Sequence, residues 1–194
     1  MDIEDAVFYT KDLRHGYNCH KSVVDYAKER SIQKGAIIVI DMVPGKGLNK
    51  HNNKTQLDYM AEVFNALKKD TLTINCGIGE KPTRIQNLIG LETVICKRPS
   101  SGSVLRGSVA ENLKYKGKPL IEVIGIRNPI IVMGFDANVC VKSSIFGSDI
   151  PSGPNQTDHI VGLLDLEKTV ITSKVLLEPL NENLNQGYGI LAGQ

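Results

Sequence analysis

The sequence contains no run of about 18 consecutive apolar residues, so no membrane-spanning helix is expected. Its first residues, MDIEDAVFYT, are acidic and lack the apolar segment of a secretory signal peptide. The four cysteines include no C-x-x-C pair, and the chain has no internal repeat and no low-complexity tract. These absences predict reduced thiols and a cytoplasmic location. Export by a route that does not use a signal peptide stays open as an alternative.

The chain also has little excess charge of either sign. Its 23 Lys and Arg residues against 21 Asp and Glu residues give a formal net charge of +2. A nucleic-acid-binding protein usually shows a concentrated basic face, so no nucleic-acid partner is expected. The length of 194 residues, 41% of them hydrophobic, is enough to bury a core without disulfides. We expect one domain over residues 1–194, with an N-terminal arm at 1–20 and a C-terminal tail at 175–194.

Apolar β-branched runs alternate with amphipathic segments along the chain. The runs predict strands at 36–40, 71–75, 93–96, 130–135 and 169–172. The amphipathic segments predict helices at 21–30, 55–69, 103–115 and from 138 towards 147. Such alternation indicates βαβ units. The expected fold is α/β: a three-layer αβα arrangement around a mostly parallel, doubly wound (Rossmann-like) sheet of about six strands.

Three chemically reactive side chains follow the ends of predicted strands. Asp41 follows AIIVI, Lys97 follows TVIC, and Cys140 lies five residues beyond IIVMGF. Taken singly, each has an ordinary explanation: a turn residue, a surface lysine and a small buried hydrophobe. In open α/β sheets, however, ligands bind outside the carboxyl ends of the strands. The coincidence of all three at one edge therefore favours a functional site.

These three groups have complementary chemistry. A thiolate is a nucleophile, and a helix N-terminus lowers the pKa of a thiol. Asn138 is a candidate N-cap residue, which would place Cys140 in the first turn of the helix. A lysine would stabilise the thiolate, and a carboxylate could take the thiol proton and return it to a leaving group.

Three sequence blocks resemble the isochorismatase-like cysteine hydrolase superfamily. The blocks are VIDMVPG, CKRPSSGSVLRGS and GFDANVCV, and they fall in the family's order within about residues 35–145. The family carries Asp-Met-Gln after an aliphatic strand, then Lys-Pro leading to Ser-Ala-Phe-x-Gly-Thr, then Gly-Val-x-Thr-Asp-x-Cys-Val. The resemblance implies that Asp41 is the general base and acid, that Lys97 orients and stabilises, and that Cys140 is the nucleophile.

The resemblance also implies the reaction and its surroundings. Family members attack a carbonyl carbon with the cysteine, release an amine or ammonia, and hydrolyse the thioester with water. They usually have a cis peptide, here between Phe135 and Asp136, and the backbone N–H groups of Asp136 and Cys140 would form the oxyanion hole. Val43, Leu105 and Asp136 would contact the substrate. A small-molecule substrate, no cofactor, no membrane contact and a homodimer or higher homo-oligomer are expected.

Departures from the family pattern keep other functions open. Asp136 stands where a small residue is usual, and a carboxylate beside a thiolate opposes its activation. A catalytically inactive member that binds a ligand or partner is therefore one alternative. Another is hydrolysis of the enol ether of isochorismate, in which the aspartate supplies the proton. Val43 and Leu105 replace the usual Gln and Phe, which predicts an altered substrate pocket.

Metal, nucleotide and anion sites receive weaker support. The nicotinamidase branch of the family holds a metal with closely spaced histidines, whereas His51 stands alone here, so no metal is expected. A zinc site at His15, Cys19 and His20 is the less favoured interpretation of three surface residues. CGIGEK, at 76–81, has G-x-G but lacks the rest of a phosphate-binding fingerprint. In the loop at 44–54, Lys46 or Lys50 could attract an anionic substrate.

Overall fold

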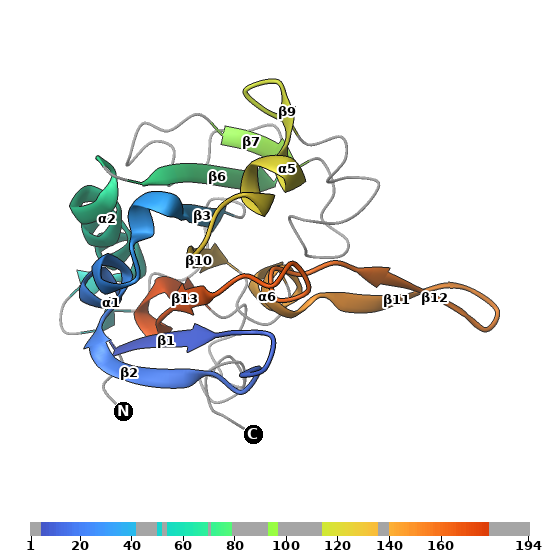
Figure 1. Ribbon diagram of the computed structural model, residues 1–194, viewed down its shortest axis with the longest axis horizontal. Coiled ribbons are helices and arrows are strands. Elements are labelled where there is room, and N and C mark those ends of the chain that lie inside the picture. Colours follow the sequence, from blue (N-terminus) through green and yellow to red (C-terminus); the bar gives the residue numbers. More distant parts are fainter. Residues whose placement is uncertain are drawn as a thin grey trace.

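The structure, a computed structural model, describes residues 5–41, 50–51, 54–69, 71–78, 93–96, 114–135 and 140–178. Its centre is a mixed sheet of eight strands (Figure 1). Seven strands lie in the order β2-β1-β13-β10-β3-β6-β7, and β14 also pairs with β10. Their bounds are β1 Asp5–Tyr9, β2 Tyr17–Ser22, β3 Ala36–Asp41, β6 Leu72–Ile78, β7 Thr93–Cys96, β10 Ile130–Phe135, β13 Val170–Thr172 and β14 Leu177–Glu178.

The middle of the sheet is parallel, and its first two strands are not. Neighbours from β13 through β10, β3 and β6 to β7 pair in parallel. β1 pairs antiparallel with both β13 and β2. All five strands expected from the apolar runs are present, which confirms an α/β fold. The sheet has more strands than the expected six or so because β14 and two N-terminal strands join it.

The sequence predicted an arm over residues 1–20. Over its described part, residues 5–20, the chain instead belongs to the sheet, because it contains β1 and most of β2. β2, with the sequence YNCHKS, is an edge strand whose side chains are mostly exposed. An edge strand needs no apolar pattern, and for that reason no strand could be predicted there. At the other end, Val175 to Glu178 of the expected tail lie in the described fold, and residues 179–194 lie outside the described residues.

Four α-helices accompany the described part of the sheet. They are α1 Val23–Glu29, α2 Gln56–Leu67, α5 Leu120–Gly125 and α6 Lys142–Phe146, with short 3-10 turns η1 Ile32–Lys34 and η3 Lys174–Leu176. The predicted helices at 21–30 and 55–69 are confirmed as α1 and α2. Of the helix predicted at 103–115, residues 103–113 lie outside the described residues. The prediction is wrong at 114–115.

Residues 114 and 115 form a strand because the next two residues make a tight turn. β8 Lys114–Tyr115 pairs antiparallel with β9 Lys118–Pro119. Between them Lys116 and Gly117 both have positive φ, 48° and 81°. Two consecutive positive φ values are typical of a two-residue hairpin turn and interrupt a helix. Two further hairpins join β4 Lys50–His51 to β5 Lys54–Thr55, and β11 Ser148–Gly153 to β12 Gln156–Ile160.

The two faces of the sheet contribute to separate hydrophobic clusters. Ile37, Val39 and Met133 belong to the cluster that also contains residues of α1 and α2. Ile38, Ile40 and Val132 belong to the cluster that also contains residues of α5 and α6. Side chains alternate between the faces of a strand, so a continuous apolar run such as AIIVI fits a strand covered on both sides.

A capping box fixes the start of α2. The Thr55 hydroxyl accepts a hydrogen bond from the Asp58 backbone N–H at 3.2 Å, and the Asp58 carboxylate accepts from the Thr55 N–H at 2.7 Å. We expect Thr55→Ala to lower the free energy of unfolding by about 1 kcal/mol, because an orphan N–H of the first turn loses its partner. Urea denaturation measures this loss, and Thr55→Ser should restore most of it. Equal stability of Thr55→Ala and wild type would contradict the capping role.

Candidate functional site at the carboxyl edge of the parallel strands

The strand order creates a topological switch point between β3 and β10. From β3 the chain continues to β6 and β7 on one side, and β10 then pairs with the other side of β3. At such a point the connections leave neighbouring strands in opposite directions, which opens a crevice at their carboxyl ends. Ile40 pairs with Gly134, and the next residues are Asp41, which ends β3, and Phe135, which ends β10.

Cys140 follows this switch point after four residues that lie outside the described part. Its side chain is 2% exposed and belongs to the cluster on the α5/α6 side of the sheet, together with Ile40 and Val132. Cys140 and Val141 have π-helical geometry and lead directly into α6, so the helix expected from 138 is confirmed over its described part. The backbone carbonyl of Cys140 accepts a 2.6 Å hydrogen bond from the buried hydroxyl of Ser144.

The topology brings the segments of two predicted site residues to one edge of the sheet. Asp41 and Phe135 end the adjacent strands β3 and β10, and β7 ends at Cys96, immediately before Lys97 in the sequence. The side chains of Asp41 and Phe135, and the whole of Val43, Lys97, Leu105, Asp136 and Asn138, lie outside what the structure describes. The predicted cis peptide at 135–136 therefore also lies outside it. Within the described residues, a cis peptide joins Asn128 to Pro129.

Gly134 allows β3 and β10 to approach closely at the switch point. Its φ is +126°, and a Cβ atom placed on it would lie 1.9 Å from the backbone oxygen of Ile40. Such a distance is far inside van der Waals contact, and L-residues rarely adopt this φ. A glycine is therefore required six residues before Cys140.

Gln56 lies beside this edge and was not predicted from the sequence. It is 7% exposed in the first turn of α2, and its Nε2 donates to the carbonyl oxygens of Leu176, at 2.9 Å, and Gly134, at 3.3 Å. This amide ties α2 and η3 to the end of β10. The signal was present, because Gln56 shares the buried stripe of α2 with Met60, Val63 and Leu67. A polar residue on an apolar stripe usually has a buried hydrogen bond to make.

The other predicted sites have mixed outcomes. Within the described ranges no group of three His, Cys, Asp or Glu side chains could hold a metal ion, and His20 lies 3.5 Å from Asp5. Cys76, Gly77 and Ile78 belong to β6, so the supposed phosphate loop would begin inside a strand. Lys46 and the side chain of Lys50 lie outside the described residues.

A separate charged cluster lies at the base of the β11–β12 hairpin. His159 Nδ1 is 2.7 Å from Asp149 and its Nε2 is 3.0 Å from Asp165, which also bonds Arg14 at 3.0 Å. The hydrogen bonds to Asp149 and Asp165 raise the pKa of His159 above its usual 6.5. Burial alone would raise the pKa of Asp165, but the Gly162 N–H, His159 and Arg14 together lower it below 3.8.

These pKa shifts predict that the hairpin base is held most firmly between about pH 4 and pH 6.5. The His159 contribution is complete below its unfolded pKa and is lost as pH rises through the raised folded pKa. The Asp165 contribution is lost as pH falls through its lowered pKa. Since His159 is half exposed, the effect on global stability should be small. An NMR titration should give a His159 pKa above 6.5 that falls in Asp149→Asn, and a value at or below 6.5 would contradict the pairing.

Comparisons of the chain with protein-family models, with curated proteins and with solved structures found no match. Among the described residues, no helix is long and apolar enough to cross a membrane.

Proposed function

We propose that this chain is an isochorismatase-like hydrolase that cleaves a C–N bond of a small amide or imide with Cys140 as nucleophile. The observation that carries the proposal is topological: β3, which ends in Asp41, and β10, which leads to Cys140, flank the switch point of a parallel sheet. The three motif blocks supply the chemistry. Lys97, which follows the end of β7, completes the proposed triad.

In the proposed reaction, the Asp41 carboxylate takes the proton of the Cys140 thiol, and the thiolate attacks the substrate carbonyl carbon. Backbone N–H groups of Asp136 and Cys140 stabilise the oxyanion. Protonated Asp41 then gives its proton to the leaving nitrogen as the C–N bond breaks and a thioester remains. Asp41 next takes a proton from water and the hydroxide attacks the thioester. As the C–S bond breaks, Asp41 returns this proton to the Cys140 sulfur, and the acid product is released.

The same proposal includes the arrangement around the site. A three-layer, doubly wound architecture is supported by the two clusters on opposite faces of the sheet, one with α1 and α2 and the other with α5 and α6. Val43, Leu105 and Asp136 are proposed to contact the substrate. A single domain, a homo-oligomeric state and a cytoplasmic location stay predictions.

The burial of Cys140 favours one second candidate. A thiol that is 2% exposed in a hydrophobic cluster can be a structural residue, and Asp41 alone could then protonate an enol ether such as isochorismate. The two candidates differ in what they require of the thiol. Only the amide reaction needs Cys140 to be nucleophilic.

The test is alkylation of the individual thiols at pH 7, followed by peptide mass spectrometry. Cys76 is a matched reference, because it is 1% exposed and lies in the same cluster as Cys140. Cys19 is a more exposed reference, although burial raises its pKa. The proposal predicts that iodoacetamide labels Cys140 at least about tenfold faster than Cys76, and that Asp41→Asn and Lys97→Ala both slow this labelling. If Cys140 were labelled no faster than Cys76, and if neither substitution changed its labelling rate, the proposal that Cys140 is a nucleophile would be refuted.

A further inference from the structure

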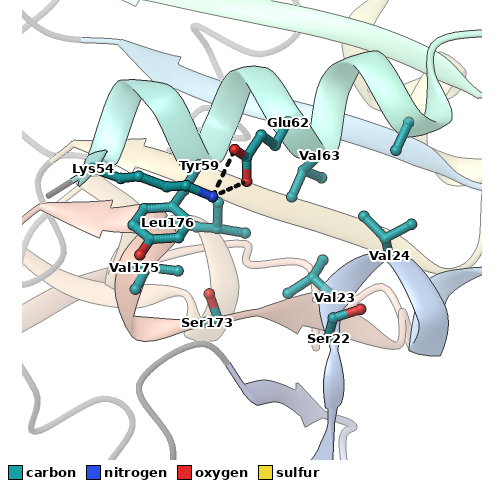
Figure 2. Close-up of a pocket in the computed structure, with 11 residues that line it drawn as sticks. Ser22, Val23, Val24, Lys54, Tyr59, Glu62, Val63, Ser173, Val175 and Leu176 are labelled. Carbon is teal, nitrogen blue, oxygen red and sulfur yellow. Dashed lines mark hydrogen bonds and ion pairs between the residues drawn. The ribbon is translucent and has the colours of Figure 1, made fainter. Parts of the chain in front are cut away.

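An apolar groove lies between α1, α2 and η3 (Figure 2). Its volume is about 250 Å³. Aliphatic side chains make most of the wall: Val23, Val24, Val63, Ala66, Val175 and Leu176. An apolar cavity of about 150 Å³ holds a benzene molecule, so this space suits one ring with a substituent, or an aliphatic body of similar size. It is too small for a docked helix.

A buried hydroxyl without a partner lies beneath the floor of the groove. Ser173, directly after β13, is 0% exposed, and its Oγ has no hydrogen-bond partner among the described residues. In Figure 2 this oxygen points into the space between α2 and the start of α1. A buried hydroxyl that makes no hydrogen bond destabilises the folded protein. A polar atom of a ligand that reached it, after a small shift of the side chains above, would remove that penalty.

The rim of the groove carries no unbalanced charge among its described residues. Lys54 Nζ lies 2.8 Å and 3.1 Å from the two carboxylate oxygens of Glu62, and it also sits 5.3 Å from the centre of the Tyr59 ring. A cation that is already paired offers little to an anionic ligand, and the carboxylate beside it repels one. The electrostatics of the rim therefore favour a neutral ligand.

We propose that this groove binds a small neutral molecule with a single ring or a comparable aliphatic body and one hydroxyl or carbonyl group. The apolar body lies against the valines of α1, α2 and η3, and the polar group bonds Ser173 Oγ. The valines of the groove belong to the cluster on the α1/α2 side of the sheet, whereas Cys140 belongs to the cluster on the α5/α6 side, so occupancy of the groove does not depend on the hydrolase proposal.

The test uses p-cresol as the probe and protein whose Val and Leu methyl groups carry ¹³C. Adding p-cresol should shift the NMR signals of Val24, Val63, Val175 and Leu176 with a saturable, low-millimolar dependence, about what so small a ligand can reach. Methyl groups of the cluster on the other face, such as Val132, should stay unchanged. Shifts that do not saturate, or that appear equally at Val132, would overturn the proposal.

Two substitutions separate the parts of the proposal. Ala66 is exposed, so Ala66→Phe fills the groove without disturbing the core and should weaken p-cresol binding at least tenfold. Asn65→Phe is the matched control, on the same helix and exposed but not lining the groove, and should leave binding unchanged. In wild type, p-cresol should bind several-fold more tightly than toluene, and Ser173→Ala should abolish this preference. If Ala66→Phe bound p-cresol as tightly as wild type, the proposal that the apolar body lies in the groove would be wrong. If Ser173→Ala still preferred p-cresol to toluene, the proposed hydrogen bond to Ser173 Oγ would be wrong.

Discussion

Replacing Gly134 by alanine should lower the free energy of unfolding by at least about 4 kcal/mol, which few single substitutions do. The new Cβ would lie 1.9 Å from the oxygen, 2.7 Å from the carbon and 2.9 Å from the nitrogen of the Ile40 backbone. None of these atoms can move aside as a flexible side chain would, because Ile40 lies on β3, which is paired on both sides. Only separation of β3 from β10 relieves the clash. Since domains are stable by about 5–15 kcal/mol, a loss of this size would leave a domain at the low end of that range only marginally folded.

Alanine variants of two other glycines serve as controls. They distinguish the loss of stability caused by this clash from the loss caused by replacing a glycine in general. Gly117 also has positive φ, +81°, but no atom lies within 4 Å of the position that a Cβ would take, so Gly117→Ala should lose only about 1–2 kcal/mol. Gly125, at the end of α5, has open space and no positive φ, so Gly125→Ala should be neutral or slightly stabilising. Urea denaturation followed by circular dichroism ranks the three. If Gly134→Ala were no worse than Gly117→Ala, the close approach of β3 and β10 would be wrong.

The central strands could be predicted from the sequence because burial on both faces leaves a continuous apolar run. AIIVI and IIVMGF became β3 and β10, which are each paired on both sides. An edge strand can show an apolar run, as TVIC of β7 does, but it does not need one, and neither does a hairpin strand. Within the described part of the chain, β2 pairs with one neighbour and exposes most of its side chains, and β11, with the sequence SDIPSG, pairs only with β12. Their strand structure comes from backbone pairing, which the pattern of apolar residues does not record.

Only those residues of the candidate site that follow the ends of apolar strands could be predicted from the sequence. Asp41 is predictable because it closes an apolar strand, and Cys140 because it follows one within a recognisable motif. The buried stripe of α2 could have marked Gln56, but not its partners, because Gly134 and Leu176 are 78 and 120 residues away in the sequence. A contact of that kind depends on how α2 and η3 pack against the end of β10. Local sequence patterns describe each element separately and leave such contacts undetermined.

The proposed function predicts that replacing Cys140 by alanine abolishes hydrolysis, with kcat/KM for a small amide substrate lowered at least about 10³-fold. Without the thiol no thioester forms, and the oxyanion hole alone supports only residual turnover. Cys140→Ser should be nearly as inactive, because a hydroxyl is far less ionised than a thiol near neutral pH. Ammonia release from a panel of small primary amides measures the loss.

Cys76→Ala is the matched control for that experiment. Both thiols are almost fully buried, at 1% and 2% exposed, and both pack in the cluster that contains α5 and α6. Exchanging either for alanine removes the same atom from a similar environment, so the losses of stability should be alike. Activity should differ, with Cys76→Ala retaining kcat/KM within a few-fold of wild type. If instead Cys140→Ala kept its activity while Asp41→Asn lost it, the thiol would be structural, and the carboxylate at the end of β3 would act without it.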